Sequence, residues 1–135
     1  MRLKKIASGT YTLYAIASDR DDCPLLDFLK KLGPNLHENR SALIALFDQV
    51  AADPDGPRLL PKTKSHTIAP GIWQFTEGRL RVAWFYDKGK IIICTHGFLK
   101  KTQGTRDSDK KEALKSREAY LAAVDQKTIV IREEP

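Results

Sequence analysis

The sequence predicts an α+β fold in which an N-terminal strand and a helical hairpin precede an antiparallel three-stranded meander and a C-terminal helix, all within one domain over residues 1–135. Three observations support this fold. Apolar residues alternate with period two in some segments and recur every three to four residues in others. Short glycine-containing turns separate the strands of the meander. The length suits one domain with its own core, and no linker or internal repeat divides it.

The N-terminal half predicts one strand and two helices. Residues 10–17 are β-branched and aromatic and alternate in polarity, as in a half-buried strand. Pro24 suits the first turn of a helix, which ends at Gly33. A second helix begins after Asn35 and ends at Asp53, and its apolar residues share one stripe. We expect the two helices to cover one face of the sheet and to leave the other face free.

The C-terminal half predicts the meander and a third helix. Residues 55–70 contain three prolines and no clear period, which predicts a loop. After the meander, Asp107 to Asp109 offer caps for a helix. A short final strand is expected near residues 128–131. The three meander strands are expected over residues 72–76, 80–86 and 91–98.

Positive charge is concentrated in one stretch of the chain. Residues 58–106 contain ten basic and two acidic residues, a net charge of +8, whereas the rest contains thirteen basic and fifteen acidic residues, a net charge of −2. Localised positive charge attracts a polyanion, and nucleic acid is the commonest one. The alternative is an ordinary solvated basic face.

Alternation on the middle meander strand predicts a candidate site. Leu80, Val82, Trp84 and Tyr86 share one face and are the core candidates, so Arg81 projects from the other face. The next strand ends in Lys100 and Lys101. In an antiparallel meander the three cations can lie on one surface and bind a phosphate, which an arginine can contact through two hydrogen bonds.

Two segments resemble the RelE/ParE toxin superfamily, and in particular its HigB-like, phage-associated branch. They are GRLRVAWFY over residues 78–86 and IIICTHGFLKKT over residues 91–102. The resemblance implies a small RelE-like sheet. It also implies a type II toxin of the cytoplasm that cleaves mRNA on the ribosome as a metal-independent endoribonuclease, needs no cofactor and is held in check by a helix-turn-helix antitoxin. The alternatives are a ParE-like toxin that inhibits gyrase and a non-catalytic nucleic-acid-binding module.

The resemblance assigns roles to some residues and leaves others open. Arg81 matches the strand arginine that contacts the scissile phosphate, and Lys100 and Lys101 match the basic pair that ends the last meander strand. Residues 72–76 lack the lysines that RelE uses as base and charge stabiliser, and Gly104, Thr105 and Arg106 stand where the branch usually has Lys-Thr-Pro. The general base is therefore open, because Lys100, His66 and His96 are all proton carriers.

Further residues are candidates for binding nucleic acid, and no metal site is expected. Cys94 and His96 have metal-ligand spacing, but nothing else supplies spaced ligands. Two cysteines are too few for a disulfide framework, which favours a reducing compartment. The basic N-terminus has the outline of a signal peptide, but residues 8–12 are too polar for one, and no apolar run could span a membrane. The nucleic-acid-binding candidates are Arg79, Lys62, Lys64 and Arg106.

Overall fold

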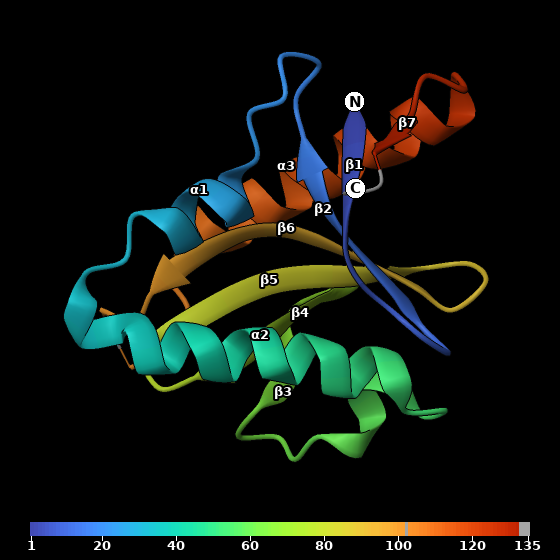
Figure 1. Ribbon diagram of the computed structural model, residues 1–135. Coiled ribbons are helices and arrows are strands. Elements are labelled where there is room, and N and C mark those ends of the chain that lie inside the picture. Colours follow the sequence, from blue (N-terminus) through green and yellow to red (C-terminus); the bar gives the residue numbers. More distant parts are fainter. Residues whose placement is uncertain (102, 133–135) are drawn as a thin grey trace.

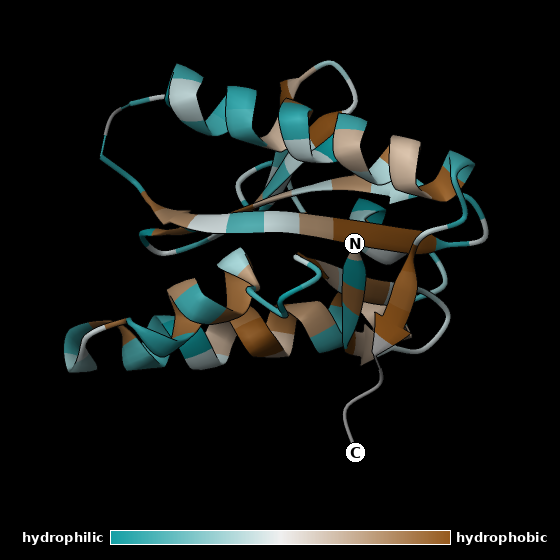
Figure 2. Ribbon diagram, turned by 90° about the horizontal axis from the view of Figure 1, so that it is seen from above, coloured by the Kyte–Doolittle hydropathy of each residue, from teal (hydrophilic) through white to brown (hydrophobic). Residues whose placement is uncertain are grey.

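The computed structural model describes residues 1–101 and 103–132, in which a mixed sheet lies between helices on its two faces (Figures 1 and 2). Within these residues the sheet has seven strands in the order β3–β4–β5–β6–β2–β1–β7. The strands are β1 (Arg2–Ser8), β2 (Thr12–Ala17), β3 (Ser65–Ala69), β4 (Ile72–Glu77), β5 (Leu80–Asp87), β6 (Ile91–Leu99) and β7 (Val130–Arg132). The helices are α1 (Pro24–Lys30), α2 (His37–Ala52) and α3 (Asp107–Asp125), with short 3-10 helices at Pro34–Leu36 and Gly56–Leu59.

The predicted fold is wrong in its sheet. The expected three-stranded meander is the β4–β5–β6 part of a larger mixed sheet, in which β2 pairs parallel to β6 and antiparallel to β1. β1 is rich in lysine and arginine, which the strand tolerates because Lys4 and Arg2 pair with Asp21. β3 lies inside the predicted loop and pairs with β4 at the edge of the sheet, where one unpaired side faces solvent and few apolar residues are needed.

The expectation of a free sheet face is also wrong, because each face has its own core. Leu80, Val82 and Trp84 of β5 pack with residues of α1 and α2. Ala83 and Phe85 of the same strand pack with Ala113 and Tyr120 of α3 and with other buried residues on the opposite face. Strand alternation thus gives β5 two buried faces, although only the first was expected to be in the core.

A β-bulge in β6 decides which of its residues share a face with Arg81. The register of β5 and β6 shifts between Ala83 and Trp84, which pair with His96 and Cys94, so Thr95 is an extra residue. A bulge of one residue reverses the alternation that follows it. Cys94 therefore belongs to the core under α1 and α2, whereas Phe98 belongs to the core under α3.

Candidate functional site

The register of four strands aligns polar residues in two adjacent rows on the α3 face of the sheet. The first row runs from His66 on β3 to Gln74 on β4, then to Ala83 and to His96 on β6. The second row contains Thr76, Arg81 and Phe98. Residues that are directly opposed on neighbouring strands point to the same side, so this face presents imidazole, amide, hydroxyl and guanidinium groups together.

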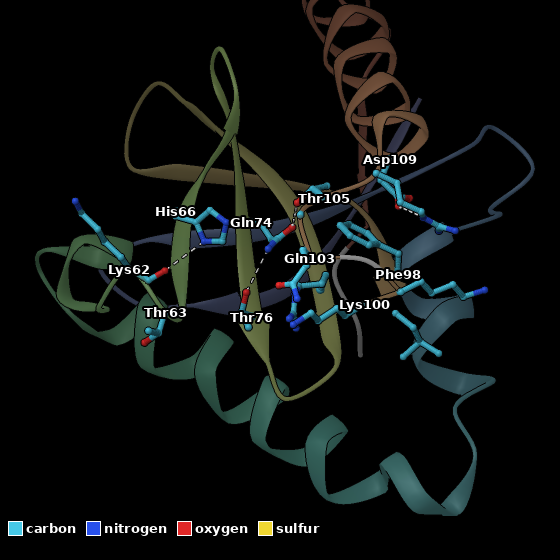
Figure 3. A pocket seen from close by; sticks show the side chains of 15 residues that line it. Lys62, Thr63, His66, Gln74, Thr76, Phe98, Lys100, Gln103, Thr105 and Asp109 are labelled. Atoms are coloured by element: carbon cyan, nitrogen blue, oxygen red, sulfur yellow. Dashed lines mark hydrogen bonds and ion pairs between the residues drawn. The ribbon is translucent and has the colours of Figure 1, made fainter.

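These rows border a pocket of about 230 Å³ that the segment after β6 closes on one side (Figure 3). The segment contributes Lys100, Lys101, Gln103, Gly104, Thr105 and Arg106. The sheet contributes His66, Gln74, Thr76, Arg81 and Phe98. Basic side chains from β5 and from the end of β6 thus meet at one pocket, together with an imidazole from β3.

Arg81 is half-buried at the pocket and has no carboxylate partner in the described part of the chain. Its Nη1 donates to the carbonyl oxygens of Gly78 at 2.6 Å and Leu80 at 3.0 Å, which fixes the guanidinium beside the β4–β5 turn. Burial lowers the pKa of Arg81 from its usual value, but a guanidinium stays charged at neutral pH. A partly desolvated cation without a counter-ion is a favourable site for an anion.

Lys100 and Lys101 are exposed at the start of the closing segment. The backbone N–H of Lys100 donates to the carbonyl of Arg79 at 2.9 Å, which places the start of the closing segment next to the turn whose Gly78 carbonyl binds Arg81. Among residues 1–101 and 103–132, no ion pair engages either ammonium group. Both remain available to a ligand.

His66 lines the pocket from β3, and its hydrogen bond determines its tautomer. Nδ1 lies 3.2 Å from the backbone carbonyl oxygen of Lys62. A carbonyl oxygen only accepts hydrogen bonds, so Nδ1 has the proton and the lone pair of the neutral ring is on Nε2. Lys62 reaches the site mainly through this carbonyl, because its side chain extends away from the pocket (Figure 3).

The floor of the pocket is neutral and hydrogen-bonded. Gln74 is only 3% exposed, accepts a hydrogen bond from Thr105 at 2.7 Å and donates to Thr76 at 3.3 Å. None of these three residues was predicted to belong to the site. Gln74 and Thr76 alternate with the apolar Trp73 and Phe75 of β4, and this alternation is the signal that could have identified them.

His96 lies behind the pocket rather than in it. It is 4% exposed, its Nδ1 lies 2.8 Å from Thr95 Oγ1, and its Nε2 lies 3.3 Å from Asp109 Oδ1. Asp109 also accepts a hydrogen bond from Arg106 Nε at 3.1 Å. These contacts join β6 to the first turn of α3 and orient Arg106, which lines the pocket. Asp109 also lines the pocket, although the sequence predicted it only as a helix cap.

Two other candidates lie outside the pocket. Lys64 forms an ion pair with Glu77 at 2.8 Å, and Arg79 is exposed in the β4–β5 turn. Thr102, the last residue of the motif after β6, lies outside the described residues. Within those residues no group of three or more His, Cys, Asp or Glu side chains is arranged to hold a metal ion, and no helix is long and apolar enough to cross a membrane.

The fold and the site define a class of protein: a seven-stranded mixed sheet among the described residues, covered by helices on both faces, with a cationic pocket where β5 and the end of β6 meet. Residues 27–118 match the family described as phage derived protein Gp49-like (DUF891), and the chain belongs to this family. The match includes every residue that lines the pocket. The resemblance is confirmed at this level, and the narrower HigB-like branch stays a prediction. No curated protein matches the chain.

Proposed function

We propose that this chain is the toxin of a type II toxin–antitoxin system and that it cleaves mRNA on the ribosome as a metal-independent endoribonuclease of the HigB-like branch. Its partners are the ribosome with its mRNA and a helix-turn-helix antitoxin, and it acts in the cytoplasm. Membership of the Gp49-like family is consistent with this proposal, and the pocket provides its chemistry.

The proposed reaction needs cations, a base and an acid. The 2′-oxygen of the RNA attacks the adjacent phosphorus in line, and negative charge grows on the non-bridging oxygens. Arg81 contacts these oxygens, and Lys100 and Lys101 supply further positive charge at the mouth of the pocket. A proton leaves the 2′-hydroxyl, and another reaches the 5′-oxygen that departs.

One observation supports the proposal most directly. Arg81 is half-buried, fixed by two backbone carbonyls and not neutralised by any described carboxylate, and it shares its pocket with Lys100, Lys101 and His66. An arginine in a purely structural role normally pairs with an acid when it is withdrawn from water. A phosphodiester supplies the missing negative charge.

The test is expression in bacterial cells followed by mapping of mRNA 5′ ends. We expect new ends within translated codons for the unmodified chain and none for Arg81→Ala. Arg58→Ala is the matched control, because Arg58 also donates to a backbone carbonyl but lies outside the pocket, next to Asp55. This control should cleave like the unmodified chain.

Two other outcomes would contradict the proposal. Growth arrest with intact mRNA and damaged DNA would indicate a gyrase inhibitor of the ParE type. Absence of any growth effect or cleavage, with RNA binding retained, would indicate a non-catalytic nucleic-acid-binding module. A folded Arg81→Ala variant that still cleaved mRNA would exclude the assigned role of Arg81.

A further inference from the structure

We infer that Nε2 of His66 is the general base that removes the proton from the attacking 2′-hydroxyl. This inference rests on the proposed endoribonuclease activity and assigns the step that the sequence left open between two histidines and a lysine. Three structural observations support this assignment: the tautomer of His66, the neutral floor of the pocket beside His66, and the position of His96 behind the pocket.

The hydrogen bond of Nδ1 prepares His66 for this role. Because the carbonyl oxygen of Lys62 holds the proton on Nδ1, the neutral ring has its lone pair on Nε2. No described donor forms a hydrogen bond with Nε2, so that nitrogen is available to a ligand in the pocket. A histidine that is oriented through one ring nitrogen and reacts through the other is a common arrangement in proton transfer.

Two polar side chains near His66 cannot perform the step. Gln74 lies directly opposite His66 in the register, but its amide is not a base, and its oxygen is already engaged by Thr105. Asp109 lines the pocket, but its carboxylate oxygens are occupied by His96 and Arg106. His66 is the only imidazole among the described residues that line the pocket.

The position of His66 suits a nucleotide whose phosphate contacts Arg81. The two residues stand on β3 and β5 in adjacent rows, with β4 between them, so their Cα atoms are roughly 12 Å apart. Both side chains line one pocket, and their combined length allows them to contact neighbouring groups of one nucleotide bound in it. His66 would face the ribose 2′-hydroxyl, while Arg81 and the two lysines face the phosphate.

In the proposed step, one P–O bond replaces another and two protons are transferred. The O–H bond of the 2′-hydroxyl breaks, its proton moves to His66 Nε2, and the oxygen lone pair forms the new bond to phosphorus. The bond from phosphorus to the 5′-oxygen breaks, and that oxygen takes a proton from the ammonium group of Lys100 or Lys101. The products are a 2′,3′-cyclic phosphate and a 5′-hydroxyl, and exchange with water restores the imidazole and the ammonium group.

The test measures single-turnover cleavage of mRNA on purified ribosomes by the unmodified chain, His66→Ala and His66→Gln. We expect both variants to cleave roughly 100-fold more slowly while binding RNA with unchanged affinity. Free imidazole should restore much of the rate of His66→Ala, in proportion to the concentration of its neutral form. His66→Gln keeps a donor for the carbonyl of Lys62, so it separates the loss of the base from a disturbance of β3.

His37→Ala is the matched control. Its ring also lies 3.2 Å from a backbone carbonyl, that of Leu32, but it stands at the start of α2, outside the pocket. This variant should cleave at the normal rate and gain nothing from imidazole. Folded His66 variants that cleave within about threefold of the normal rate would overturn the assignment and leave the endoribonuclease proposal intact. If the unmodified chain fails to cleave mRNA, the proposed function fails, and the role of His66 fails with it.

Discussion

At the scale of single residues, the alternation of β5 was sufficient to place Arg81 on the face opposite the core of Leu80, Val82 and Trp84. Alternation was not sufficient to predict the hydrogen-bond partner of His96 on β6. The sequence puts this histidine in an apolar strand, but its partner Asp109 comes from α3, and no local pattern predicts that contact. Local periodicity therefore indicates which face a side chain occupies, whereas its partner depends on tertiary packing.

Because Arg81 is half-buried and has no described carboxylate partner, we expect small anions to stabilise the protein. Sulfate or phosphate should bind the folded pocket and not the unfolded chain, so at ten times the dissociation constant the stabilisation is about 1.4 kcal/mol, or roughly 4 °C in Tm. Thermal unfolding with increasing sulfate at constant ionic strength measures this effect. Arg81→Gln should lose most of it, whereas Arg58→Ala should keep it. An equal response in all three proteins would show that the anion binds elsewhere.

The raised pKa of Tyr120 should make the free energy of unfolding decrease at alkaline pH. Burial and the hydrogen bond that its hydroxyl donates to Asp87 raise the pKa of Tyr120 above its ordinary value near 10. The folded state therefore keeps a proton that the unfolded chain loses, so the associated stability is complete below about pH 10 and declines as the pH rises further. Urea unfolding between pH 8 and 11 should show a steeper decline for the unmodified chain than for Tyr120→Phe. Equal slopes would contradict this explanation.

At the scale of elements, the sequence predicted the helices and the β4–β5–β6 strands but missed β1 and β3. Both strands lack a clear apolar alternation, because β1 has charged residues that pair with the loop after β2 and β3 is an edge strand. The bulge at Thr95 was also missed, and it turns Phe98 toward Arg81. An uninterrupted alternation would have placed Phe98 on the face of Ile92 and Cys94.

Substitution of Gly97 tests the packing of α1 on β6. A Cβ at this position would lie 2.3 Å from the ring of Phe28, which has little room to move because it packs against the core under α1 and α2. Gly97→Ala should therefore destabilise the protein by about 1–3 kcal/mol, measured by urea unfolding. Gly104→Ala is the control, because nothing lies within 4 Å of the position of its Cβ, and it should leave stability nearly unchanged. A stable Gly97→Ala variant would contradict the close contact.

At the scale of the whole molecule, β5 is buried from both sides, and the pocket forms where cover by helices gives way to the segment after β6. A net charge of +8 over residues 58–106 predicted a basic surface, and the structure concentrates part of that charge at one pocket while pairing Lys64 and Arg106 with acids. Composition gives the amount of charge, but only the fold determines which cations remain without partners.

Analysis of the ends produced from an mRNA held on purified ribosomes tests the central claim most directly. If the pocket binds a phosphodiester and promotes attack by the 2′-oxygen, the addition of this protein should produce fragments with 2′,3′-cyclic phosphate and 5′-hydroxyl ends. Replacement of the 2′-hydroxyl by hydrogen at the cleaved nucleotide should prevent the cut. Intact mRNA, or fragments with 5′-phosphate ends, would contradict the account.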